Sequence, residues 1–156
     1  MQRKKNNSIY NPLIAANELG KIQFNAEVII VDASSGLQAK SNYEQKHLAG
    51  ALFIDLTTDL AEIEDDVSVG GRHPLPSLAS FEQTLSRLGI TPQSHVVIYD
   101  DKYGSIASAR FWWMLKAIGH EKVQVLNGGL QAAENAGIEL NDQPVTIYPN
   151  YYGKIS

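Results

Sequence analysis

The stretch from Val96 to Leu130 constrains the fold more than any other part of this sequence. It opens with a β-branched apolar run, residues 96–98, which is typical of a buried strand. After a polar loop, the alanine-rich segment 106–118 is too long for a strand and stops at a glycine, so it predicts a helix. A second apolar run, residues 123–126, follows at once. Strand, helix and strand in this order predict a βαβ unit with parallel strands.

The expected place for a site is the loop at residues 100–105, because open parallel sheets bind ligands beyond the carboxyl ends of their strands. Two further apolar runs, residues 28–31 and 52–54, also predict strands. Three of the four predicted strands end on a carboxylate: Asp32, Asp55 and Asp100. An aspartate in this position commonly accepts backbone N–H bonds where the chain turns, and we prefer this interpretation for Asp32 and Asp55. For Asp100, which opens the loop, a role in acid–base or metal chemistry stays open.

Shorter patterns predict the remaining elements. Helices are predicted at residues 13–19, at 41–46, at 81–88 with Ser80 as the cap, and at 130–135, and strands at 28–31 and 52–54. The acidic connection that starts at Thr57 and runs on through two glycines to Pro76 is longer than packing requires, which indicates a functional or mobile loop. After Ile138 no regular pattern continues.

Length and composition limit the classes of protein to consider. The chain of 156 residues is expected to form one domain, 13–138, between an N-terminal arm, 1–12, and a tail or interdomain linker, 139–156. It has no cysteine, which excludes disulfides and thiolate zinc sites. The formal charge of −4 argues against a nucleic-acid partner. No apolar run suits a membrane span or a signal peptide, so we expect a cytoplasmic protein. We also expect no metal and no cofactor.

Several motifs, in a fixed order, resemble those of the rhodanese-type sulfurtransferases. They are Tyr43–Ala51 (YEQKHLAGA), Gly71–Pro76 (GRHPLP), Val97–Asp100 (VIYD), Ser108–Trp113 (SARFWW), and Gly119–His120 followed by Leu126–Leu130 (LNGGL). The match covers residues 28–137 and is similar to the N-terminal domain of the two-domain thiosulfate and 3-mercaptopyruvate sulfurtransferases. It implies a rhodanese-like α/β domain, with a parallel sheet of about four or five strands and helices on both faces.

The resemblance also implies a chemistry that this chain cannot perform alone. The family carries a sulfane sulfur as a persulfide on a cysteine thiolate, and in tandem members that cysteine lies in the second domain. Here Asp100 holds the position of the nucleophile, and Asp101 beside it would repel an anionic donor. We therefore expect the N-terminal, cysteine-free domain of a tandem sulfurtransferase, inactive alone, with a cysteine-bearing second domain as its partner in the same gene product or in trans.

Two alternatives concern the chain without such a second domain. It could be a stand-alone rhodanese-like binding or regulatory module without sulfur chemistry. The helix from Phe111 to Leu115 is apolar on every side, which suits an element covered on two faces. Tyr148, Tyr151 and Tyr152 of the tail are candidates for that cover, and otherwise a homodimer would bury the patch.

The resemblance points to His73 as an accessory acid or base. In mercaptopyruvate-type members the histidine of this loop faces the cysteine of the second domain, paired with an aspartate whose position holds Thr57 here. An exposed loop histidine ahead of a proline is an equally weighted interpretation. Asp55, Thr57, Arg72 and Arg110 are further candidates, either as residues of the active cleft or as structural residues.

The remaining histidines and Arg110 have mainly structural interpretations. His47 is expected to pack beside its helix, and His95 and His120 to lie on the surface. Arg110 stands in an apolar helix, so we expect it to pair with Asp32, Asp55 or Asp100, which is about three times more plausible than binding a substrate anion.

Overall fold

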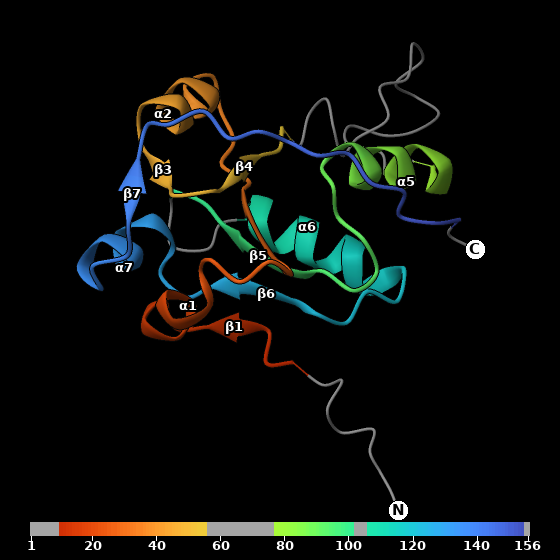
Figure 1. Ribbon diagram of the computed structural model, residues 1–156, viewed down its shortest axis with the longest axis horizontal. Helices are drawn as coiled ribbons and strands as arrows, with labels where there is room; N and C mark the ends of the chain where they lie inside the picture. The colour runs from red at the N-terminus through yellow and green to blue at the C-terminus, as the bar shows by residue number, and fades with distance from the viewer. Residues whose placement is uncertain (1–9, 56–76, 102–105, 155–156) are drawn as a thin grey trace, which may run out of the picture.

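The fold is organised around one parallel sheet. The computed structural model describes residues 10–55, 77–101 and 106–154. Its sheet has the strand order β1-β6-β5-β2-β4, and every neighbouring pair is parallel (Figure 1). The strands are β1 (Leu13–Ile14), β2 (Val28–Asp32), β4 (Leu52–Phe53), β5 (His95–Tyr99) and β6 (Val123–Leu126). A separate antiparallel pair joins β3 (His47–Leu48) to β7 (Leu140–Asn141). The predicted α/β class and parallel sheet are confirmed, with five strands.

The helices connect the strands as the sequence pattern indicated. They are α1 (Ala16–Ile22), α2 (Ala39–Gln45), α5 (Leu78–Arg87), α6 (Ile106–Ala117) and α7 (Gly129–Asn135). The predicted βαβ unit is confirmed as β5, α6 and β6, since β5 and β6 pair in parallel with Val96 opposite Val123. Gly128, at the N-cap of α7, has φ 86°, and a Cβ there would lie 2.7 Å from that of Ala132, so the start of this helix requires glycine.

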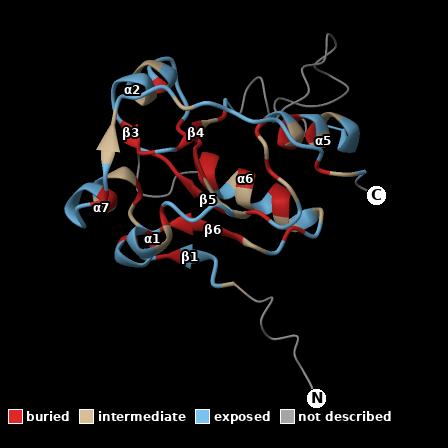
Figure 2. Cartoon of the chain, in the orientation of Figure 1, coloured by how far each residue is buried: buried red, intermediate tan, exposed pale blue. Residues whose placement is uncertain are grey.

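Alternation along the strands builds a core on each face of the sheet. In β5, Val96 and Ile98 belong to one buried cluster, whereas Val97 and Tyr99 belong to the other. The first cluster includes side chains of α5 and α6, and the second includes side chains of α1 and α7. Helices therefore cover both faces, and the buried colour in Figure 2 follows the central strands between them. Strands buried on both faces explain the continuous apolar runs of the sequence.

Four local predictions were wrong, each for a physical reason. Leu13 and Ile14 form edge strand β1 instead of a helical turn, since two residues are too few to show a period. The cap of α5 is Ser77, whose Oγ accepts from Ser80 N at 3.1 Å, so Ser80 lies inside the helix. Helix α2 likewise begins before Ser41, at Ala39. His120 is buried, because its ring packs under the tail of the chain.

The chain after β7, residues 142–154, is called the C-terminal segment below. In Figure 1 it runs from β7 past α2 to α5. The N–H of Asn150 donates to Ser86 O at 2.9 Å, and the N–H of Tyr152 donates to Ser86 Oγ at 2.9 Å. The ring of Tyr152 is buried in the cluster of α5 and α6, whereas Tyr148 and Tyr151 are exposed. Of the three tyrosines proposed as a cover for α6, Tyr152 alone is buried.

Candidate functional site

The carboxyl ends of three neighbouring strands meet at one edge of the sheet. Register places Asp32 opposite Tyr99 on one side and opposite Phe53 on the other. The backbone continues this pairing beyond the strands, because the N–H of Ala33 donates to Tyr99 O at 2.8 Å and that of Ile54 donates to Asp32 O at 3.0 Å. The edge where parallel sheets bind ligands therefore carries Asp32 and the residues that follow β4 and β5.

Asp32 lies at the centre of a hydrogen-bond network that spans this edge. Its Oδ1 accepts from Ser34 N at 2.8 Å, and its carboxylate also accepts from the hydroxyl of Tyr99. The Tyr99 oxygen in turn accepts from Leu48 N at 3.2 Å. Ser34 Oγ accepts from the N–H of Asp101 at 3.0 Å. Asp32 thus holds the turn after β2 in place, as the backbone-bonding interpretation expected.

The environment of Asp32 disfavours its ionised form. Burial raises its pKa from 3.8 to about 6, the nearby charge of Asp101 raises it further, and hydrogen bonds from Ser34 and Tyr99 lower it. Burial also raises the pKa of Tyr99 well above 10.0, so its hydroxyl stays a donor to Asp32. The negative charges of Asp32 and Asp101 each disfavour an anion beside them.

Asp100 lies at this edge and has no exposed surface, with 0% of its area accessible. Its carboxylate accepts a short hydrogen bond from the hydroxyl of Ser108 on α6. Its carbonyl oxygen accepts from the N–H of Leu130 on α7 at 2.9 Å. Asp100 therefore joins the end of β5 to the helices on both faces of the sheet. Asp101, the next residue, is exposed.

A small hollow of about 230 Å³ opens beside these carboxylates. Its lining comes from the ends of β2 and β5, from α2 and from α7: Asp32, Ser34, Ala39, Asn42, Tyr43, Gln45, Lys46, Asp101 and Leu130. Lys46 lies among them, but its Nζ is bound to Glu134 at 2.5 Å. Among the described residues that line the hollow, Lys46 is therefore the only cation, and its charge is already paired with Glu134.

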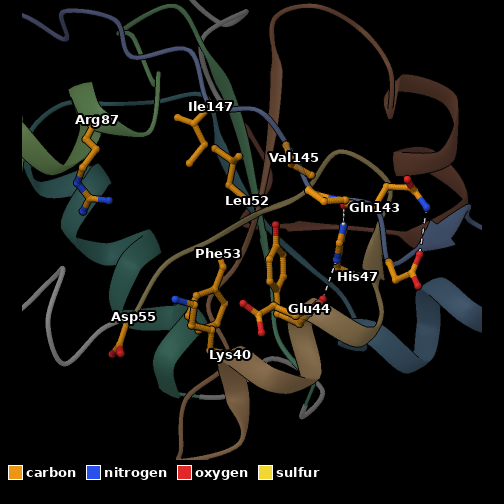
Figure 3. A pocket seen from close by; sticks show the side chains of 13 residues that line it. Lys40, Glu44, His47, Leu52, Phe53, Asp55, Arg87, Gln143, Val145 and Ile147 are labelled. Atoms are coloured by element: carbon orange, nitrogen blue, oxygen red, sulfur yellow. Dashed lines mark hydrogen bonds between the residues drawn. The ribbon is translucent and has the colours of Figure 1, made fainter.

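A larger cavity of about 720 Å³ lies on the other side of α2, next to the end of β4. It is lined from four elements by Lys40, Tyr43, Glu44, His47, Leu52, Phe53, Asp55, Arg87, Asp142, Gln143, Pro144, Val145 and Ile147 (Figure 3). Charged groups of both signs ring an aromatic floor, in which Tyr43 and Phe53 lie 5.3 Å apart between ring centroids. Burial raises the pKa of Tyr43 to about 12, so this phenol stays neutral. Asp55 lines this cavity and is exposed.

The structure describes some of the other predicted site residues but not all of them. Arg110 is half-buried on α6, and its pairing with a strand-ending aspartate stays a prediction. His73, Thr57 and Arg72 lie outside the described residues, so their roles stay predictions. His47 is buried, as expected, and His95 is half-buried.

Sequence reasoning missed the hydroxyl groups that organise this edge. Ser34 follows Asp32 at the spacing of a side-chain turn, which was a usable signal. Tyr99 resembled one more apolar strand residue, and nothing in the sequence marked Ser108 as the partner of Asp100. In the part of the chain that the structure describes, no group of three or more possible metal ligands comes together, and no helix is long and apolar enough to cross a membrane.

Comparisons with known proteins agree with this architecture. The profile of the rhodanese-like domain family matches residues 15–136. SseB of Mycobacterium tuberculosis, named for thiosulfate sulfurtransferase activity, is 43% identical over 129 residues, which are 80% of this chain and 44% of that protein. Thiosulfate/3-mercaptopyruvate sulfurtransferase 2 of Arabidopsis thaliana is 33% identical over 138 residues, 85% of this chain and 39% of that protein.

Solved structures give the same result. The 3-mercaptopyruvate sulfurtransferase from Leishmania major superposes with a TM-score of 0.78 at 28% identity, covering 93% of this chain and 41% of the other. This chain therefore spans less than half the length of these relatives.

Proposed function

Because this chain belongs to the family of rhodanese-like domains, we propose that it is the N-terminal, cysteine-free domain of a tandem-rhodanese sulfurtransferase and is inactive by itself. The names of its relatives suggest thiosulfate or 3-mercaptopyruvate as the sulfur donor, and we propose a thiophile as the acceptor. The match to less than half of each relative supports a second domain in the complete enzyme.

The observation that carries the proposal is the state of Asp100. In the family this position belongs to a thiolate that must meet its donor, whereas Asp100 is fully buried and bonded to Ser108. A carboxylate cannot form a persulfide, and the sequence has no cysteine at any other position. We therefore propose that the nucleophile comes from another domain. Its thiolate would attack the outer sulfur of thiosulfate, breaking the S–S bond and releasing sulfite, or the sulfur of 3-mercaptopyruvate, breaking the C–S bond and releasing the pyruvate enolate; in each case the leaving group takes the electron pair.

This domain would then supply one wall of the cleft around the thiolate of its partner. Asp55 is exposed where β4 ends, and the sequence that leads to His73 continues from there. We propose His73 as the general acid or base, in the family position opposite the cysteine. Position 57 holds threonine instead of aspartate, so His73 would act without that carboxylate partner.

A transfer assay with and without a cysteine-bearing C-terminal domain tests the proposal. The chain alone should show no turnover with thiosulfate or 3-mercaptopyruvate, and turnover should appear after the added domain, taken from a tandem relative, completes the cleft. His73→Ala in the complex should lower kcat by about 10²-fold, and the His95→Gln control should leave it unchanged.

Turnover by this chain alone, above the uncatalysed rate, would refute the assignment. If the added domain neither binds nor gains activity, the stand-alone binding or regulatory module becomes the better account, because the buried Asp100 suits that role equally well.

A further inference from the structure

The C-terminal segment is fixed to the domain at two points, and a buried histidine lies at each. Near its start, the ring of His47 contacts Gln143 O at 2.9 Å. Near its end, the ring of His120 contacts the hydroxyl of Tyr152 at 2.9 Å. Both rings are almost fully buried, at 1% and 3% exposed. The two histidines differ in the chemistry of their partners, and hence in the protonation state that each contact requires.

His47 has an acceptor at both ring nitrogens. Nδ1 lies 2.7 Å from Tyr43 O and Nε2 lies 2.9 Å from Gln143 O, as the dashed lines in Figure 3 show. Two carbonyl oxygens can both be satisfied only when each ring nitrogen carries a proton. The ring of Tyr43 stacks on the imidazole with centroids 4.4 Å apart, an arrangement that suits a cation. Neither contact of His47 needs an unprotonated ring nitrogen, so the geometry of this end differs from that at His120.

His120 meets a carbonyl acceptor at Nε2 and the hydroxyl of Tyr152 at Nδ1, and the backbone of Lys122 also hydrogen-bonds its ring. Nε2 lies 2.9 Å from Ser94 O, so it must carry a proton, and Nδ1 is left as the acceptor for the Tyr152 hydroxyl. A protonated Nδ1 would place N–H against O–H. Among the described residues the Tyr152 hydroxyl makes no other hydrogen bond, and its ring lies in an apolar cluster with Phe111, so its proton has no second acceptor. Added protons therefore weaken this contact.

We propose that protonation of His120 releases the end of the C-terminal segment, residues 150–154, while His47 keeps its start bound at Gln143. Release breaks the contact with Tyr152 and, with it, the two backbone bonds to Ser86. The segment thus has a proton-sensitive end and a proton-tolerant end.

The groups around His120 favour its neutral form. Burial is the largest cause and lowers its pKa below 6.5. Hydrogen bonds to the backbone of Ser94 and Lys122 offset part of this shift, and the charges of His95 on β5 and Lys122 ahead of β6 lower the pKa. Burial raises the pKa of Tyr152 to about 12, so its hydroxyl keeps the proton that it donates. On α6, the Lys116 ammonium lies over the ring of Trp112, 6.0 Å from its centroid. We therefore expect residues 150–154 to be released under mildly acidic conditions.

The consequence for catalysis rests on the proposed function, but the release itself does not. If a second domain follows this segment, a free end at residues 150–154 would loosen the orientation of that domain and open the cleft between the two. Hydrogen exchange on this chain alone tests the release without any sulfur transfer, so the two proposals fail separately.

The reporters are the backbone amides of Asn150 and Tyr152, which donate to Ser86. After correction for intrinsic exchange, their protection should fall between about pH 7.5 and about pH 5.5, by at most about tenfold, which is the limit that proton linkage to one histidine sets over this range. Amides of β5 should keep their protection, which separates release from global unfolding. His120→Gln should remove the pH dependence, whereas His95→Gln should retain it but move it to higher pH, because the His95 charge lowers the pKa of His120.

Tyr152→Phe provides a second variant, because it keeps the buried ring and deletes only the hydroxyl. Its protection should change less than twofold over the same range, about the uncertainty of such a measurement. Amide protection that does not vary with pH in the wild type would overturn the proposal. So would a pH-dependent loss of protection in His120→Gln or Tyr152→Phe as large as in the wild type.

Discussion

Replacing Asp32 with asparagine should change how the stability of this domain depends on pH. The carboxyl has a pKa of about 6 in the folded protein and 3.8 as its ordinary value. A raised folded pKa means that its contribution to stability is fully present below the ordinary value and is lost as pH rises through about 6. A tenfold change in proton affinity is worth about 1.4 kcal/mol, so ionisation of Asp32 reduces the free energy of unfolding by about 3 kcal/mol at neutral pH.

Asparagine keeps the shape and the oxygen that accepts from Ser34 N, and it does not ionise. The difference in unfolding free energy between Asp32→Asn and wild type should therefore grow by about 2 kcal/mol in favour of the mutant between about pH 4.5 and about pH 7.5. Denaturant titrations at several pH values measure it, and taking the difference cancels all other titrating groups.

Asp142→Asn is the matched control, because Asp142 is exposed, and its difference from wild type should stay constant. Asp101→Asn should lower the pKa of Asp32, since the Asp101 charge raises it. Parallel pH profiles for Asp32→Asn and wild type would refute the assignment of a buried, destabilising carboxylate.

Three further substitutions test the local structure. Asp100→Cys should give a thiol that reacts slowly with thiol reagents in the native state and no sulfur transfer, because the position is fully buried; rapid labelling would show that the loop opens. Ser108→Ala should lower the free energy of unfolding by roughly 1–3 kcal/mol, since it removes a donor to a buried carboxylate, and a denaturant midpoint equal to wild type would contradict this. Gly89→Ala should be destabilising by at least about 1 kcal/mol, because φ there is +80° and a Cβ would lie 2.7 Å from Tyr148 O; an unchanged thermal melt would contradict it.

The sequence predicted the strands with continuous apolar runs best. The apolar runs that became β2, β5 and β6 are buried on both faces, so their pattern follows directly from their place in the sheet. The two residues of β1 take their conformation from pairing with β6, which no local pattern records.

At the candidate site the sequence indicated where the carboxylates lie but not their environment. Asp32 and Asp100 both end a strand, and nothing in the sequence indicates which one has a raised pKa and which one accepts a hydrogen bond from Ser108. His120 was expected on the surface because the residue that covers it, Tyr152, is 32 positions away in the chain. Such contacts depend on tertiary packing, so residue type and spacing could not supply them.

The two outermost strands of the sheet, β1 and β4, have two residues each. An open strand edge is a template on which another chain can add by backbone hydrogen bonds, and its hazard grows with its length. In the described part of the chain, each side of the sheet therefore offers a neighbour only a short strand. Such short outer strands are a poor template for edge-to-edge aggregation, so the light scattered per unit concentration should stay constant as the protein is concentrated.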